Sequence, residues 1–313
     1  MFAYLVRRIL ATIPVMGVVA IFVFSLLYLS PGDPAVIIGG DTATLEDIAK
    51  IREKLGLDRP FLVQFGTWLW NVVRGDLGIS IFTNLPVSKL ILQRVEPTIA
   101  LTISTLLVTV VVAIPMGVLA AWKAGTWIDR LVMAFAVLGF SFPVFVTGYL
   151  MIFSLSIWAD LLPVQGYVSI TNGFFAFLPN MVLPSLALGM VYIALIARIT
   201  RASMLEVLSQ DYIRTAHSKG LSKPNVLFGH ALKNAAVPIV TTLGIGLALL
   251  ISGVVVTESV FAIPGLGRLT VDAILRRDYP IIQGVILVFS AAYVMINLMI
   301  DVAYTFLDPR IRY

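Results

Sequence analysis

Few side chains in this sequence could take part in covalent chemistry. The two histidines, His217 and His230, lie too far apart, and too far from other ligands, to indicate a metal site. The absence of cysteine excludes disulfides, a thiolate metal site and a cysteine nucleophile. No Gly-Lys pair occurs, so the phosphate-binding loop of an ATPase is missing. Both histidines also lie outside the apolar stretches, where an intramembrane protease would need its catalytic groups. We therefore expect a non-catalytic chain without a metal or cofactor of its own.

The elements that carry these residues are mostly apolar. Hydrophobic residues make up 59% of the 313 residues, charged residues 12%, and the mean hydropathy is +0.98. A soluble domain carries about twice that charged fraction. Crossing a bilayer takes about 20 apolar residues, and six runs are long enough: 9–29, 98–121, 131–156, 177–197, 237–257 and 281–304. We expect an all-α integral membrane protein with six transmembrane helices, forming a single domain over residues 1–313.

The distribution of charge gives these spans a direction. With the N-terminus inside, the cytoplasmic pieces are 1–8, 122–130, 198–236 and 305–313, and they hold twelve Lys and Arg against four acidic residues. The opposite side holds ten Lys and Arg against twelve acidic residues. Cytoplasmic loops are enriched in Lys and Arg. We therefore expect a multi-pass protein with both termini in the cytoplasm.

The largest external piece is residues 30–97, an insertion between spans 1 and 2. Thr44 can cap a helix with apolar positions at 45, 48, 51 and 55, and Gly56 can close it. A second helix begins near Pro60, with Phe61, Phe65, Trp68 and Val72 on one face. Such amphipathic helices could lie on the membrane surface or on a partner protein.

The long cytoplasmic piece is residues 198–236. Its first part is expected to continue the fourth span as a polar helix that Gly220 breaks. Ser222 can then cap a new helix with Pro224 in its first turn. A loop of this length needs a reason, and docking a soluble partner is the obvious one.

The energy for transport has to come from elsewhere if this is a transporter. A secondary carrier couples to ions through ionisable residues within its spans, and this chain has almost none there. No filter-like signature of a channel is visible. A carrier or channel that acts without an ATPase remains the alternative to a protein driven by a partner at the cytoplasmic loop.

Segment 211–241 resembles the cytoplasmic "EAA" loop of ATP-binding-cassette importer permeases, in the form used by the dipeptide, oligopeptide and nickel subgroup. Arg214, Thr215, Ala216 and Gly220 occupy the matching positions. Arg-Thr replaces Glu-Ala of the general pattern, and Pro238 lies further from Gly220 than the general pattern places its proline. Other segments resemble the subgroup's "B" permease in their order and spacing: 1–8, Leu29–Pro34, Gly56–Pro60, Gly75–Ser80, Thr257–Phe261, Pro264–Gly267, Arg277–Pro280 and Asp308–Arg312.

This resemblance implies a type I importer transmembrane fold in the bacterial inner membrane. Such a permease pairs with a second, similar permease, and two ATPase subunits that bind ATP and Mg dock beneath it. A solute-binding protein delivers the substrate from outside, and no nucleic acid is involved. ATP-driven closure of the ATPases would move the spans between inward-open and outward-open states.

The resemblance also assigns candidate residues. The segment that contacts the ATPase would include Arg214, Thr215, Ala216, Lys219, Gly220, Leu221, Ser222 and Pro224. Ala216 and Leu221 would supply apolar contacts, and Arg214, Lys219 and Lys223 polar ones. The resemblance does not assign the pathway, for which the candidate residues are Phe140, Ser141, Pro143, Gly253 and Glu258. Phe140, Ser141 and Pro143 are expected to break the third span. Glu258 and Arg268 could gate the path or touch the binding protein, although we favour ordinary solvation of a loop for both.

The substrate does not follow from this chain, because in this family the binding protein largely sets it. Peptides, glutathione, nickel chelates and some sugars or opines are all compatible with the sequence. Di- or oligopeptides are the expectation, on the frequency of that subgroup.

Overall fold

The computed structural model describes residues 2–29, 35–36, 44–54, 56 and 58–307. Within them the regular structure is helical, and the pairing of Ile79 with Pro86 is an isolated bridge. The predicted all-α class is therefore confirmed. Three of the sequence features named above lie outside the described residues. They are residues 30–34 and 308–312 of the family resemblance, and position 55 of the helix expected after Thr44.

The chain divides into two compact units, residues 1–95 with 269–295 and residues 96–268 with 296–313. The prediction of a single domain stays a prediction. The first unit contains α1 (Phe2–Leu29), α3 (Leu45–Lys54), α4 (Phe61–Val73) and parts of α5 (Val87–Trp122), α11 (Leu266–Arg276) and α12 (Tyr279–Leu307). The second contains the rest of α5, α11 and α12, together with α6 (Trp127–Ser141), α7 (Val144–Met151), η1 (Ile152–Trp158), η2 (Ile170–Asn172), α8 (Phe174–Leu208), α9 (Asp211–Ser218), η3 (Asn225–Ala231) and α10 (Leu232–Val260).

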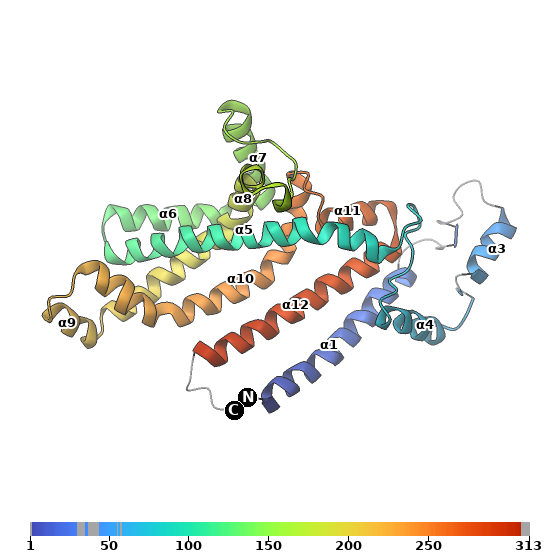
Figure 1. Ribbon diagram of the computed structural model, residues 1–313, viewed down its shortest axis with the longest axis horizontal. Helices are drawn as coiled ribbons and strands as arrows, with labels where there is room; N and C mark the ends of the chain where they lie inside the picture. The colour runs from blue at the N-terminus through green and yellow to red at the C-terminus, as the bar shows by residue number, and fades with distance from the viewer. Residues whose placement is uncertain (1, 30–34, 37–43, 55, 57, 308–313) are drawn as a thin grey trace. The chain divides into compact units, whose positions relative to one another are not determined.

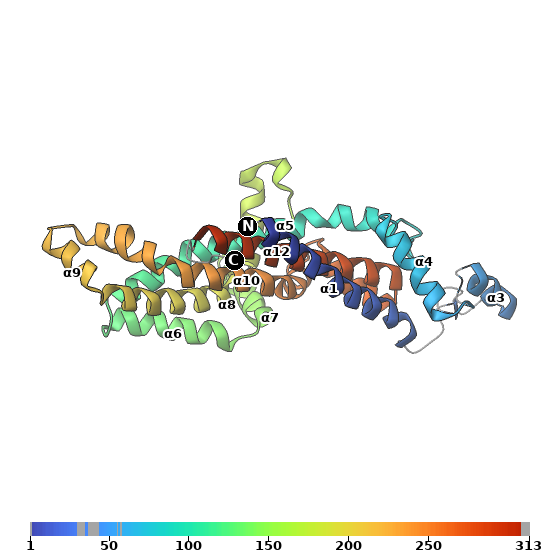
Figure 2. The ribbon, with the colours of Figure 1, turned by 90° about the horizontal axis from the view of Figure 1, so that it is seen from below.

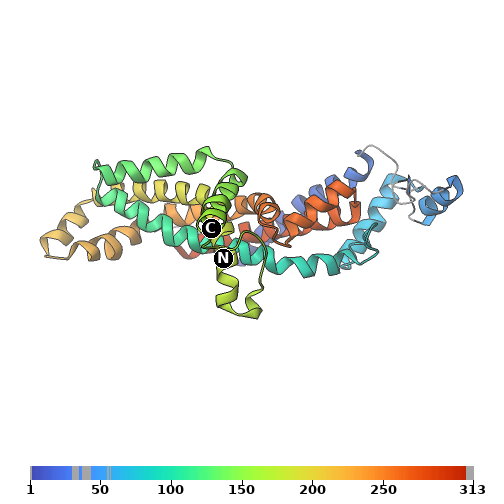
Figure 3. The ribbon, with the colours of Figure 1, turned by 90° about the horizontal axis from the view of Figure 1, so that it is seen from above.

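Five of the described helices are long and apolar enough to cross a membrane: Arg7–Leu29, Val87–Trp122, Phe174–Leu208, Asn225–Val260 and Tyr279–Ile300. The predicted third span is formed by two helices, Trp127–Ser141 and Val144–Trp158, that meet at 109°, and counting this bent pair as one span gives up to six among the described residues. The break was predicted at this place, and Figure 3 shows the change of direction after α6. Its cause is Pro143, because a proline forces the residue before it out of the helical region. Phe142 accordingly has φ −102° and ψ 131°.

In the first unit, α4 packs against the C-terminal turns of α1, and α12 runs beside α1 (Figures 1 and 2). The ring of Phe24 in α1 lies 5.5 Å from Phe65 and 5.3 Å from Trp68, measured between centroids. The expected apolar face of α4 is thus confirmed, and it contacts the chain's own first span. The helix α3 begins directly after Thr44, and Gly56 has a φ of +66°, as expected for the residue that ends it.

In the second unit, α8 lies between α6 and α10 and carries much of the core (Figure 2). Leu188, Ile193 and Met204 along α8 are buried almost completely. Small residues allow close approach of the helices. A Cβ added at Gly117 in α5 would lie 2.6 Å from the carbonyl oxygen of Ala197 in α8, so this contact requires glycine.

Candidate functional site

The predicted ATPase-contacting segment forms a separate short helix beyond the ends of α8 and α10 (Figures 1 and 2). The sequence predicted that α8 would continue as one polar helix to Gly220, and this is wrong. The helix α8 ends at Leu208, Gln210 adopts an extended conformation with φ −74° and ψ 149°, and α9 begins at Asp211. The amides of Ser209 and Gln210 bond the carbonyl oxygens of Glu206 and Val207, which closes the last turn of α8.

Gly220 ends α9 in the left-handed conformation that the sequence predicted, with a φ of +76°. The Gly220 amide donates to the carbonyl oxygen of His217 at 3.0 Å, and the Leu221 amide donates to that of Ala216 at 3.3 Å. This pair of bonds is the Schellman motif, in which only a residue without a Cβ avoids strain. The Ser222 carbonyl oxygen then accepts from the Val226 amide, so a helix restarts at the predicted place.

One face of α9 packs against the chain itself. Ile213 and Ala216 are 2% and 6% exposed and belong to a cluster with Val226, Leu227 and Ala231. The expectation that Ala216 offers an apolar contact to an ATPase is therefore corrected, because its methyl group is covered by its own chain. The other residues assigned to this segment remain at the surface: Arg214, Thr215, Lys219, Gly220, Leu221, Ser222, Lys223 and Pro224.

Two apolar side chains make the exposed surface here partly hydrophobic. Leu221 is 37% exposed and Tyr212 is 44% exposed. Sequence reasoning did not single out Tyr212. The signal was available, because Tyr212 lies one position before the buried Ile213 on a short helix and so points away from the core.

An ion pair that the sequence did not predict fixes the neighbouring helices. The Arg201 guanidinium in α8 donates to both oxygens of Asp129 in α6, at 2.5 and 2.7 Å. The Asp129 carboxylate also accepts from the Gly125 amide at 2.9 Å and is 4% exposed as a residue. Bidentate pairs of this kind fix both distance and orientation, so this ion pair ties α6 to α8.

Glu258 is not a solvated loop residue, contrary to expectation. It lies within α10 and is 0% exposed. Its Oε1 accepts from the Thr98 hydroxyl at 2.6 Å, and its Oε2 accepts from the Arg268 amide at 3.0 Å. The Thr98 hydroxyl in turn accepts from the Leu266 amide at 2.8 Å. This carboxylate therefore holds the chain between α10 and α11 against α5. A methyl group added at Gly265 would overlap it.

A second carboxylate organises the loop between η1 and α8. Glu96 accepts from the hydroxyl groups of Tyr167 at 2.9 Å and Ser169 at 2.5 Å. Burial raises the pKa of Tyr167 above its usual value, and the bond to Glu96 raises it further, so this hydroxyl stays a donor at neutral pH. The Gly166 amide also donates to the Phe261 carbonyl oxygen at 3.0 Å. The loops at this end of the second unit are thus joined to one another.

The candidate pathway residues separate into two groups. Phe140 and Ser141 line a hollow of about 290 Å³ with Met133, Ala136, Val137 and Arg198. The Arg198 guanidinium lies 5.4 Å from the centre of the Phe140 ring. Pro143 is exposed at the break beside them. Gly253 instead lies against Leu188 of α8, and Glu258 is buried as described, so neither lines that hollow.

Comparison with known proteins decides the family. The profile of the family described as "Binding-protein-dependent transport system inner membrane component" matches residues 113–313. The chain belongs to this family. A second profile, for the N-terminal part of such membrane components, matches residues 1–102. The permease family to which the resemblance pointed is therefore confirmed, and with it a multi-pass inner-membrane transport component.

Relatives cover the whole chain. A protein of Sinorhizobium fredii named as a peptide ABC transporter permease (y4tP) is 54% identical over 99% of both chains. The glutathione transport system permease of Escherichia coli K12 is 42% identical over 100% of both chains. Among solved structures, the MetNI methionine ABC transporter matches with a TM-score of 0.58 at 18% identity, covering 70% of this chain and 96% of that one. At that identity the match supports the fold alone, the type I importer transmembrane fold.

Proposed function

We propose that this permease is one membrane-spanning half of an ATP-binding-cassette importer for di- or oligopeptides or a related solute such as glutathione. A binding protein delivers the solute from outside, and a second permease completes the pathway. Two partner ATPases supply the energy through alternating access. Relatives named for peptide and glutathione transport support the substrate class.

The observation that carries the proposal is the geometry of α9 and Gly220. A short helix held on the chain's own core by Ile213 and Ala216 can transmit force, because its buried face ties it to α8 and α10. The exposed side of α9, with Arg214, and the turn after it, with Lys219 and Leu221, can enter a groove of an ATPase. The proposed segment is therefore both packed on the chain's own core and accessible at the surface.

Paired Leu→Asp variants test the contact. Leu221→Asp places a charge on the proposed contact, and Leu161→Asp is its control, because Leu161 is 69% exposed in the loop between η1 and α8. We expect L221D to lose most of the ATPase that co-purifies with the chain and to lose ATP-dependent uptake. L161D should keep its ATPase.

Two results would contradict the proposal. Equal recovery of ATPase with both variants would show that α9 is not the contact. Uptake that persists in the absence of ATP and of any ATPase would identify a carrier or channel instead. The thermal unfolding profile of L221D must match that of the wild type, so that a loss of ATPase in this variant cannot be explained by misfolding.

A further inference from the structure

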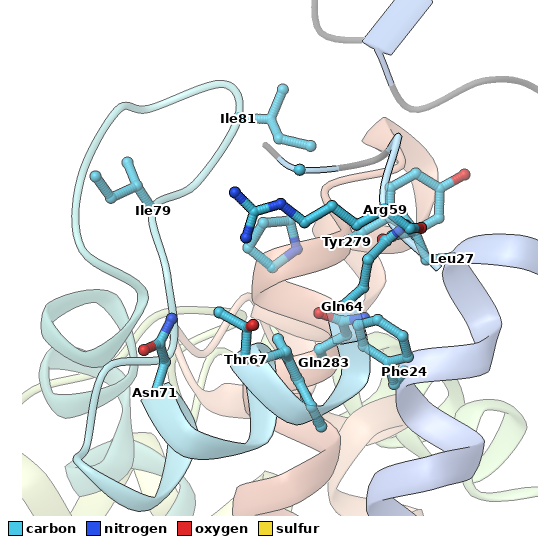
Figure 4. Close-up of a pocket in the computed structure, with 13 residues that line it drawn as sticks. Phe24, Leu27, Arg59, Gln64, Thr67, Asn71, Ile79, Ile81, Tyr279 and Gln283 are labelled. Atoms are coloured by element: carbon cyan, nitrogen blue, oxygen red, sulfur yellow. The ribbon is translucent and has the colours of Figure 1, made fainter. Parts of the chain in front are cut away.

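The first unit contains a cavity of about 300 Å³, within the usual size range of ligand sites. Three of the segments quoted for the family resemblance meet around it, although they are far apart in sequence. Gly56–Pro60 contributes Gly56 and Arg59, Gly75–Ser80 contributes Ile79, and Arg277–Pro280 contributes Tyr279 and Pro280. Figure 4 shows the side chains of Arg59, Ile79 and Tyr279 around this space, together with residues of α1 and α4.

Buried polar contacts hold two of these segments together. The Ser80 hydroxyl donates to Asp278 Oδ2 at 2.6 Å, and the Ile81 amide donates to Oδ1 at 3.3 Å. Ser80 and Asp278 are 1% and 2% exposed. The wall carrying Ile79 and Ile81 is therefore fixed to the start of α12, and the cavity is a built feature of this unit.

The cavity lies at one boundary of the membrane. Phe24 and Leu27 belong to the last turns of the apolar span Arg7–Leu29, and Gln283 belongs to the first turns of the span that begins at Tyr279. The Gln283 amide donates to the Val23 carbonyl oxygen at 3.4 Å, so these two span ends lie side by side. This placement holds whichever side of the membrane the boundary faces.

The lining can take an anion. Arg59 is the charged residue among the described residues that line the cavity, and no Asp or Glu is among them. Within the described part of the chain, no carboxylate pairs with the Arg59 guanidinium. Figure 4 shows the Arg59 side chain extended over this space, and Thr67 and Asn71 of α4 also line the cavity. Arginine binds phosphate oxygens well because its planar fork offers several donors.

The surroundings select an amphiphile rather than a soluble anion. Phe24 and Trp68 form an aromatic part of the lining. Beyond the cavity, α1 exposes Ile21 at 50% and Phe22 at 58%, and the outer face of α4 exposes Leu62 at 78% and Val73 at 72%. An apolar helix with this exposure next to a span end is suited to the boundary between headgroups and acyl chains.

We propose that this cavity binds the headgroup of an anionic glycerophospholipid, with its phosphate at Arg59 and its acyl chains along the exposed faces of α1 and α4. The lipid would be an integral part of the first unit. The proposal depends on the membrane placement and not on which solute the importer carries.

Native mass spectrometry of the full-length chain with its co-purifying partners tests this site. Wild-type protein, stripped of lipid, is titrated with phosphatidylglycerol, with zwitterionic phosphatidylcholine and with inorganic phosphate. Phosphatidylglycerol should occupy one site per chain more tightly than phosphatidylcholine. Arg59→Gln should weaken it about tenfold, the usual effect of losing a charge-assisted contact. The near-isosteric Asn71→Asp should also weaken it, by repulsion.

Arg74→Gln is the matched control, because Arg74 stacks 4.5 Å from the Trp70 ring at the other end of α4 and does not line the cavity. It removes the same charge and should leave binding within about twofold of wild type. Unchanged binding in both R59Q and N71D would overturn the proposal. So would equal binding of phosphatidylcholine, or displacement of the lipid by inorganic phosphate at the same concentration, which would indicate a site for free anions.

Discussion

Glu258 is a carboxylate inside an apolar helix, and its partners explain how it is accommodated there. An intramembrane charge is stable only where polar groups surround it. Both of its oxygens accept hydrogen bonds, one from the Thr98 hydroxyl and one from the Arg268 amide. The Thr98 hydroxyl also accepts a hydrogen bond from the Leu266 amide, so this one side chain makes two buried hydrogen bonds. Thr98 is therefore the residue whose removal should expose the role of this network.

Thr98→Val keeps the shape of the side chain and removes the hydroxyl. We expect the free energy of unfolding to fall by about 1–3 kcal/mol, the usual cost of leaving buried polar groups unsatisfied. Thr98→Ser keeps the hydroxyl and should fall by less than T98V does. Thermal unfolding in detergent, followed by circular dichroism, measures both. A T98V protein as stable as wild type would show that the contacts with Glu258 and Leu266 contribute nothing.

Single residues could be predicted from sequence where the reason was local. The left-handed φ of Gly220 follows from the lack of a Cβ and from its place after a helix. The burial of Glu258 could not be predicted in the same way, because Thr98 lies 160 positions away in the chain. Ala216 is intermediate: its type fitted both a partner contact and a core position, and only the packing of α9 distinguishes them.

At the scale of the element, the short helix α9 has one buried face, which carries Ile213 and Ala216, and one exposed face. Ala216→Leu adds volume to a filled cluster and should lower the free energy of unfolding by about 1–3 kcal/mol, as overpacking does. Thr215→Leu, one position earlier on the exposed face, should change it by no more than about 0.5 kcal/mol. Chemical denaturation monitored by tryptophan fluorescence compares the two. Equal effects would contradict the assignment of the buried face.

The ion pair between α6 and α8 gives a second prediction about elements. Arg201→Gln leaves Asp129 buried without its partner, which typically costs about 3–5 kcal/mol. The double variant D129N/R201Q removes the uncompensated charge and should recover a large part of that loss. Thermal unfolding midpoints of the single and double variants provide the comparison. If D129N/R201Q is less stable than R201Q, the ion pair between Asp129 and Arg201 does not stabilise the protein by charge compensation.

The sequence predicted elements well where apolar length or a proline determined them. Five spans and the break at Pro143 follow from such signals. The end of α8 at Leu208 carried no such signal, because Glu-Val-Leu-Ser-Gln contains neither glycine nor proline. There the turn depends on the packing of Ile213 and Ala216 against distant residues, and tertiary contacts override the local preference for a continued helix.

At the scale of the whole molecule, direction in the membrane is the property on which the proposed mechanism depends. An ATPase can reach α9 only if α9 is cytoplasmic, and a binding protein can deliver solute only to the opposite side. The excess of Lys and Arg in four segments predicts that arrangement. The chain itself provides a clean test, because it contains no cysteine that could react in the background.

Two single-cysteine variants report the two sides. Ser218 and Thr83 are both exposed, the first at the end of α9 and the second in the loop between α4 and α5. In spheroplasts, a membrane-impermeant maleimide should label Thr83→Cys and leave Ser218→Cys unlabelled until the membrane is permeabilised. The reverse pattern would place α9 outside, away from any cytoplasmic ATPase, and would contradict the proposed drive. Labelling of both cysteines in sealed spheroplasts would contradict the crossing of the bilayer between them, on which alternating access depends.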